Sequence, residues 1–394
     1  MADNEAAQAQ RANLVKSLKE KGELADPRME AAFLHVPRHE FVPDIPLDKV
    51  YADEALPFKR DADGSVISSS SQPLMMAMML RQLDLQPGHN VLEIGAGTGY
   101  NAAIMQYMVG DEGNVTTLEL DQDLVRQAQD TLQRLSLGSI RVVHADAAGG
   151  YAPRAAYDRI IATAGVWDIP KAWVQQLKPR GIIVAPIWLD AIQVSAALRL
   201  QDDGTLYSES NLPCGFIRLR GAGAGPVMTQ RVGNSALVLT SNEVPALDGA
   251  ALHTLLSDDV ERVLLDIRLN SSDYFHGFMT WFVLNLPQGF TFAFYQMGAN
   301  QQDYGIASGN GIALIQAGSA CFVSFDKHGE VYSFGAPDAF IAFQQCLHMW
   351  DAAGRPDWRN LRLRLYPIQQ PPSTITTGKL YPRQDHILYA WQTR

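Results

Sequence analysis

The segment EIGAGTG, at residues 93–99, is the first place where residue types and spacing suggest chemistry. It follows the apolar residues Val91 and Leu92, as expected where a buried strand leads into a helix. Glycines there let the backbone approach a ligand, and the first N–H groups of a helix point outward. The spacing is G-x-G-x-G rather than the G-x-G-x-x-G of dinucleotide sites, which disfavours a pyrophosphate cofactor. The residues expected to contact a cofactor here are Glu93, Gly95, Ala96, Gly97, Thr98 and Gly99.

The acidic residue before the first glycine favours a particular charge on that cofactor. Glu93 attracts an ammonium or sulfonium group and repels a phosphate, as Coulomb's law requires of a carboxylate. We therefore expect a cofactor with a positive centre.

Two further carboxylates follow predicted strands. The run VTTLEL ends at Glu119 and Leu120, and the run IRVVHA is followed by Asp146 and Ala147. At the tip of a strand, a carboxylate accepts hydrogen bonds from ribose hydroxyls, which is the role expected of Glu119, and Asp146 is placed to receive an adenine amino group. Each feature also has a purely structural explanation: the glycines could form a tight turn, Glu119 could be a solvated strand end, and Asp146 could cap the next turn. Their joint placement favours a nucleoside-containing cofactor.

The predicted elements around these residues alternate between strands and helices. From Val91 to Ile187, apolar β-rich runs alternate with amphipathic stretches, which is typical of a doubly wound, mostly parallel α/β sheet. Two helices are expected before it, over residues 5–21 and from Met29 through Phe33.

A glycine-rich stretch, GAGAGP at residues 221–226, suggests a flexible connection between two domains. We expect a first domain over residues 1–220, a linker over 221–229 and an α+β accessory domain over 230–394. Helices are expected in the accessory domain at residues 245–256, 274–286 and 336–350, among several strand runs.

Composition narrows the class of protein. The chain has 394 residues, of which 47% are hydrophobic and 19% charged, so it can bury a large core and is not a disordered or fibrous protein. A net charge of -10 argues against binding nucleic acid through general phosphate neutralisation. We expect neither a membrane span nor export, because no apolar run reaches spanning length and residues 1–22 lack the apolar stretch of a secretory signal. Three scattered cysteines suggest neither disulfides nor a zinc site and fit a cytoplasmic setting. No histidine spacing predicts a metal site.

The segment VLEIGAGTGYNAA resembles the S-adenosylmethionine loop of protein-L-isoaspartate O-methyltransferases. AFLHVPRHEFVP, YADEALPF, SSSQPLMMAMML and YDRIIATAGVWDIPKAWVQQLKPRGIIVAPI resemble further segments of that family, in order, across residues 28–220. The resemblance implies a Rossmann-like class I methyltransferase fold. It also implies that the glycines lie against the methionine and ribose part of S-adenosylmethionine, with Glu119 on the ribose and Asp146 near the adenine. Ala147 replaces a glycine that is usual in the family.

The same resemblance implies that Ser71 is the active-site serine, with Ser69 and Ser70 beside it. A carboxylate that attacks a sulfonium methyl needs placement and exclusion of water rather than a strong base, and hydroxyl groups suit that task. In place of the family's glycine-rich approach the chain has DADGSVISSSSQP, which leaves the register open by a residue or two. The plain alternative is that Ser71 caps the helix that begins near Pro73.

The leading functional hypothesis is an S-adenosylmethionine-dependent carboxyl methyltransferase that esterifies isoaspartyl residues of proteins or peptides. In the family the ester closes to a succinimide that reopens to aspartate, which is repair. An alternative is a tailoring enzyme that methylates one aspartate of a ribosomally made peptide, since some relatives with extensions do so. A second alternative is a non-catalytic module that binds a nucleoside. We expect no nucleic-acid or membrane partner, and the sequence leaves the oligomeric state open.

Overall fold

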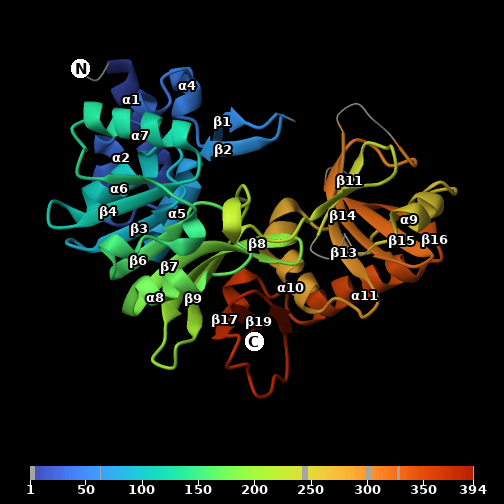
Figure 1. Cartoon of the computed structure of the whole chain (residues 1–394). Coiled ribbons are helices and arrows are strands. Elements are labelled where there is room, and N and C mark those ends of the chain that lie inside the picture. Colours follow the sequence, from blue (N-terminus) through green and yellow to red (C-terminus); the bar gives the residue numbers. More distant parts are fainter. Residues whose placement is uncertain (1–4, 63, 242–246, 299–302, 326–328, 394) are drawn as a thin grey trace.

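The computed structural model describes residues 5–62, 64–241, 247–298, 303–325 and 329–393. Its largest element is a ten-stranded sheet with the order β18-β19-β17-β9-β8-β7-β6-β3-β4-β5 (Figure 1). The strands from the first part of the chain are β3 (Asn90–Ile94), β4 (Asn114–Glu119), β5 (Arg141–His144), β6 (Tyr157–Ala162), β7 (Leu177–Leu189), β8 (Ile192–Leu200) and β9 (Leu206–Cys214). The pairs from β5 through β7 are parallel, and the pairs from β7 onward are antiparallel.

Helices alternate with the parallel strands, as the sequence predicts for a doubly wound α/β fold. They are α5 (Pro73–Leu83), α6 (Tyr100–Val109), α7 (Gln122–Arg134) and α8 (Lys171–Gln176). The residues of β3 from Val91 to Ile94 are completely buried because helices cover both faces of the parallel strands. The carboxyl ends of β3, β4, β5 and β6 meet at one edge, where open α/β sheets bind ligands.

Four helices precede the sheet: α1 (Glu5–Glu20), α2 (Pro27–His35), α3 (Arg38–Phe41) and α4 (Leu47–Val50). Asp26 caps α2 by accepting a hydrogen bond from the Arg28 N–H, and Pro27 occupies the first turn, where it has no N–H to lose. Phe33 and Phe41 pack edge-on against Tyr100 of α6. A short hairpin of β1 (Leu56–Arg60) and β2 (Val66–Ser70) follows and leads into α5.

A second sheet of seven antiparallel strands has the order β10-β11-β13-β14-β15-β16-β12. Its strands are β10 (Thr229–Arg231), β11 (Leu237–Thr240), β12 (Glu261–Leu264), β13 (Thr291–Met297), β14 (Gly309–Gln316), β15 (Ser319–Ser324) and β16 (Glu330–Gly335). The helices of this part are α9 (Gly249–Leu256), a π-helical turn η5 (Asp273–Phe278) that continues into α10 (Met279–Leu284), and α11 (Asp338–Ala352). They lie where the three helices are expected, although residues 245 and 246 of the first expected helix lie outside the described residues.

The end of the chain departs from the expected division into residues 1–220 and 230–394. Three strands, β17 (Leu361–Pro367), β18 (Lys379–Pro382) and β19 (His386–Gln392), return to the first sheet, where β17 pairs with β9 (Figure 1). The pairing supplies hydrogen-bond partners to the edge of β9, and Leu361, Leu363 and Leu365 continue the buried face of that sheet. The two sheets therefore share one hydrophobic core, which includes Ile183 of β7 and Phe282 of α10.

The glycine-rich segment also differs from a flexible linker. Gly221–Gly223 form a short 3-10 turn, η3, and the Ala222 N–H donates a hydrogen bond to the Asp146 carboxylate (2.7 Å). Gly225 lies against Trp167, where an added Cβ would be 2.5 Å from the Trp167 Cβ. The segment is therefore packed against the loops that follow β5 and β6.

Cys214, Cys321 and Cys346 are free thiols. Within the described ranges, no helix is both long and apolar enough to cross a bilayer, and no group of three or more metal-binding side chains is found.

Candidate functional site

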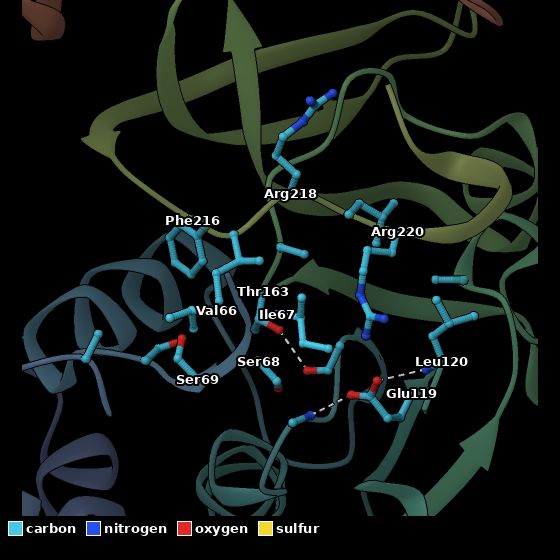
Figure 2. A pocket seen from close by; sticks show the side chains of 18 of the residues that line it. Val66, Ile67, Ser68, Ser69, Glu119, Leu120, Thr163, Phe216, Arg218 and Arg220 are labelled. Atoms are coloured by element: carbon cyan, nitrogen blue, oxygen red, sulfur yellow. Dashed lines mark hydrogen bonds between the residues drawn. The ribbon is translucent and has the colours of Figure 1, made fainter. Parts of the chain in front are cut away.

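A cavity of about 380 Å³ lies at the carboxyl edge of the parallel strands (Figure 2). That volume is in the range of small-molecule and cofactor sites. Four parts of the chain form its walls: the β1–β2 hairpin with the start of α5, the loop after β3, the ends of β4, β5 and β6, and a segment that we call the crossover segment, residues 215–222, which leads from β9 toward the second sheet. The sequence predicts the first three walls but not the fourth.

The glycine loop has the backbone that its sequence predicts. Gly95, Gly97 and Gly99 all have positive φ angles, of 96°, 52° and 85°. A Cβ on Gly95 would lie 2.8 Å from the Thr163 Oγ1, which donates a hydrogen bond to the Gly95 carbonyl oxygen at 2.7 Å. A larger residue at position 95 would therefore displace Thr163, which also lines the cavity. Gly95 and Gly97 face the cavity, whereas Ala96, Thr98 and Gly99 are not among its lining residues.

Glu119 lines the cavity at the tip of β4, and the backbone holds its carboxylate. Its Oε2 accepts a hydrogen bond from the Gly97 N–H at 2.9 Å. Its Oε1 accepts from the N–H groups of Leu120 (2.9 Å) and Asp121 (3.2 Å). A carboxylate has about four lone-pair positions, so these three bonds orient the group and leave capacity for a ligand hydroxyl. Leu120 lines the cavity as well.

Glu93 does not lie in the cavity wall, contrary to the expectation that it contacts the cofactor. It is completely buried behind the loop, where Oε1 accepts from the Asn101 Nδ2 (2.7 Å) and Oε2 from the Thr117 hydroxyl (2.6 Å). Burial raises the pKa of Glu93 to about 7, although both hydrogen bonds lower it. The side chain of Glu93 points into the protein interior rather than toward the cavity, and the motif alone does not show this direction.

Asp146 lies after β5, as predicted, but it does not line the cavity. Its Oδ1 accepts from the Ala148 N–H (2.9 Å), which caps the turn η1 (Ala147–Gly149), and its Oδ2 accepts from the Ala222 N–H of the crossover segment. Both carboxylate oxygens of Asp146 thus accept hydrogen bonds from the protein's own backbone, and the contact with an adenine amino group stays a prediction. Ala147 does line the cavity.

Two of the three candidate serines face the cavity. Ser69 and Ser71 are among its lining residues, as is Ser68. Ser70 instead points into the protein, 4% exposed, with its Oγ 3.5 Å from the Arg38 Nη2. An ideal Cβ on Gly97 would be 3.7 Å from the Ser68 Oγ and 3.8 Å from the Ser69 carbonyl oxygen, so the serine segment adjoins the glycine loop.

Ser71 does not cap α5. The cap position is Gln72, which makes no capping hydrogen bond through its side chain, and the Leu74 N–H is satisfied instead by the Asp53 Oδ1 at 2.9 Å. The structure therefore excludes the alternative that Ser71 serves as the cap of the helix that begins at Pro73.

Arg38 positions the serine segment, a role that is not evident in the sequence beyond the residue's place in VPRHEFVP. The side chain is completely buried and donates hydrogen bonds to the carbonyl oxygens of Val50 (2.8 Å) and Ser71 (3.0 Å), among others. Burial lowers the pKa of its guanidinium, yet an arginine remains charged there. The Arg38 guanidinium therefore connects residues 50–54 to the serine segment through hydrogen bonds.

The crossover segment closes the remaining side of the cavity with Phe216, Arg218 and Arg220. All three are missed in the sequence, because they lie at the end of the predicted first domain, where no motif marks a site. Figure 2 shows Arg220 extending toward Glu119 and Arg218 pointing away from it. Arg220 and Lys59 of β1 both bind Asp121, at 2.7 Å and 3.0 Å. The hydrogen bond from Arg220 holds the pKa of Asp121 below its usual range, with Lys59 contributing. This ion cluster joins the hairpin, the tip of β4 and the crossover segment around the opening.

The sheet order, the glycine loop and the cavity at the strand tips define a class I S-adenosylmethionine-dependent methyltransferase fold. The sequence model of the family described as Protein-L-isoaspartate(D-aspartate) O-methyltransferase (PCMT) matches residues 9–224. The chain belongs to this family, as its motifs predict.

Two relatives agree with this assignment, and a solved structure shares the fold. A protein-L-isoaspartate O-methyltransferase of Methanopyrus kandleri is 38% identical over 220 residues, which are 56% of this chain and 95% of the relative. One of Pyrococcus horikoshii is 36% identical over 212 residues, 52% of this chain and 91% of the relative. A solved structure titled protein-L-isoaspartate O-methyltransferase has a TM-score of 0.53 at 24% identity and covers 90% of this chain and 96% of its own. Its likeness in fold therefore extends beyond residue 224.

Proposed function

We propose that this protein transfers a methyl group from S-adenosylmethionine to the free carboxylate of an isoaspartyl residue in a protein or peptide, and that its use is protein repair. The family assignment supports the reaction. The observation that carries the proposal is the single cavity in which Ser69 and Ser71 face the glycine loop and Glu119.

The described residues fit the cofactor. Glu119 retains capacity to accept a ribose hydroxyl, and Gly95 and Gly97 present backbone without side chains to the cavity. Ala145 and Ala147, with Leu120, provide small and apolar wall on the side where an adenine would lie. When bound, S-adenosylmethionine supplies a methyl group on a sulfonium sulfur, an electrophile that a carboxylate oxygen attacks without prior activation.

The serines suit the other reactant. We assign to the Ser71 hydroxyl, with Ser69 beside it, the role of donating a hydrogen bond to one oxygen of the substrate carboxylate while the second oxygen remains free to react. A neutral donor orients the carboxylate without the strong pairing of an arginine. Phe216 and Ile217 of the crossover segment add apolar wall that would exclude water from the reacting atoms.

A pair of peptides that differ only in the linkage at one aspartyl residue tests this function. We expect mass spectrometry to show a methyl ester, followed by a succinimide, on the isoaspartyl peptide alone. A methyl ester on a linear or constrained aspartyl peptide instead would support the tailoring alternative. If S-adenosylhomocysteine binds while no peptide is methylated, the proposal fails and the non-catalytic alternative gains support.

A further inference from the structure

A second cavity of about 370 Å³ lies between the first sheet and the helices of the second. One wall consists of Trp188 with residues 191–194 and 213–216, around the ends of β7, β8 and β9. The other wall is built by Phe275 and Met279 of the η5–α10 helix, with Thr280 of α10, Thr240 of β11 and Phe294 of β13. The part of the chain beyond the family match therefore supplies half of this cavity.

The second cavity adjoins the methyl-transfer site. Gly215 and Phe216 line both cavities, so the two cavities are neighbours that share this stretch of backbone. The position of Phe216 is well determined, because the Gln193 side chain binds both the N–H and the carbonyl oxygen of Phe216. The Phe216 N–H donates to the Gln193 Oε1 (2.7 Å), and the Gln193 Nε2 donates to the Phe216 carbonyl oxygen (3.0 Å).

The chemistry of the walls selects an apolar group. Trp188, Ile192, Phe275, Met279 and Phe294 contribute aromatic, aliphatic and thioether surface, and none of the residues lining the cavity carries a charge. A charged side chain would lose its hydration there without gaining a partner, whereas an aromatic or aliphatic one would leave water for apolar contacts. Phe275 is 42% exposed at the rim, where it packs against Phe325 (ring centroids 4.9 Å apart).

The helix that forms the second wall is firmly placed. Phe278, in η5, stacks on Phe282 of α10 with ring centroids 5.2 Å apart, and it meets Phe343 and Trp350 of α11 edge-on. These rings are buried in the core that the two sheets share. The cavity is thus a preformed feature of the fold, as specific binding sites usually are.

We infer that the second cavity is a subsite for an apolar side chain of the polypeptide substrate, near the isoaspartyl residue. The inference rests on the proposed function. A peptide whose isoaspartyl carboxylate lies at Ser71 continues past Phe216, and an extended chain advances roughly 3.3 Å per residue. The side chain that enters the cavity therefore belongs to a residue within about three positions of the isoaspartyl group. Residues 230–394 thereby select substrates by sequence around the damaged site.

The test compares methylation of isoaspartyl peptides in a polar Gly/Ser background, in which Phe or Asp is placed in turn at each position up to about three residues from the isoaspartyl group. At one position we expect the KM for the Phe peptide to be roughly tenfold below that for the Asp peptide, with kcat unchanged. Phe275→Asp should abolish that difference and leave the KM of the all-polar peptide unchanged. Phe275→Leu should retain it.

The matched control is Ile341→Asp, the same kind of change at an apolar residue of α11 that is 47% exposed and does not line the cavity. It should behave like the unchanged protein. The subsite is refuted if no position distinguishes Phe from Asp, or if Phe275→Asp keeps the difference, while the all-polar isoaspartyl peptide is methylated. If the all-polar peptide is not methylated at all, the proposed function itself fails, and the two failures are thereby distinguished.

Discussion

The guanidinium of Arg38 donates a hydrogen bond to the carbonyl oxygen of Ser71, with 3.0 Å between Nη2 and that oxygen. The same group also binds carbonyl oxygens of residues 50–54, which precede the β1–β2 hairpin. Because the arginine is completely buried, no water competes for these bonds. The place of the serine in the site is thus determined by a residue more than thirty positions earlier in the chain.

Replacing Arg38 with Met should lower both stability and activity. The change keeps much of the apolar stem but leaves several buried carbonyl oxygens without donors, so the free energy of unfolding should fall by about 3 kcal/mol. Chemical denaturation measures this loss. Arg81→Met, at an arginine whose side chain is 48% exposed and paired with Glu23, is the control and should cost less than about 1 kcal/mol. Equal losses in the two variants would show that Arg38 has no special structural role.

Ser71→Ala should impair methyl transfer without affecting cofactor binding. Loss of one hydrogen bond to a charged carboxylate corresponds to a decrease in kcat/KM of roughly 10- to 100-fold. Calorimetry should give the same Kd for S-adenosylhomocysteine as in the unchanged protein. Ser70→Ala removes a hydroxyl one residue away that points out of the cavity, and its kcat/KM should stay close to the original value. The assignment of Ser71 is wrong if the two alanine variants are equally active.

Glu119→Gln should weaken binding of S-adenosylhomocysteine. Three backbone N–H groups donate to the two carboxylate oxygens, and an amide has one oxygen and an NH₂ group that would face a donor. We expect the Kd to rise roughly 10- to 100-fold in titration calorimetry. Glu112→Gln, on the exposed turn before β4, makes the same chemical change away from the cavity and should leave the Kd unchanged. An unaltered Kd in Glu119→Gln would remove Glu119 from the cofactor site.

The buried carboxyl group of Glu93 should make stability depend on pH. Its pKa in the folded protein is about 7, above the 4.5 of the free side chain, so the folded state binds the proton more tightly. The protonated form stabilises the fold fully below pH 4.5, and this contribution is lost as the pH rises through 7. The cost reaches about 3 kcal/mol at higher pH.

Glu93→Gln mimics the protonated form, and a Gln amide can exchange hydrogen bonds with Asn101 and Thr117. Denaturation at pH 5 and pH 8 should show that the variant gains stability relative to the unchanged protein at pH 8. Other carboxyl groups titrate equally in both proteins and cancel in the comparison. Parallel pH profiles would show that Glu93 does not titrate in this range.

Much of the cofactor-binding part of the site could be predicted, because it is formed by residues close together in the sequence whose patterns are local. The glycines of residues 95–99 adopt the positive φ angles that their type permits, and Glu119 is the last residue of β4, near the end of the predicted strand run VTTLEL. The α/β alternation likewise determines which edge of the sheet carries the site.

The remaining features depend on contacts between distant residues, which local patterns do not reveal. Arg220 binds Asp121 across 99 positions, and the Ala222 N–H donates a hydrogen bond to Asp146 from 76 positions away. The glycine-rich segment at residues 221–226 predicts a flexible linker, because its composition is the same whether or not the segment packs against other residues. Only the fold shows that this segment is packed. Similarly, LRLRLYP predicts a strand, but its pairing with β9 depends on the free edge of another part of the chain.

The most direct test of the whole account is a side-by-side incubation of the isoaspartyl and aspartyl forms of one peptide with the protein and S-adenosylmethionine, followed by mass spectrometry. The account predicts addition of one methyl group to the isoaspartyl form alone, with a succinimide appearing afterwards, and loss of this product in Ser71→Ala. Methylation of both forms at equal rates, or of neither while S-adenosylhomocysteine still binds, would contradict it.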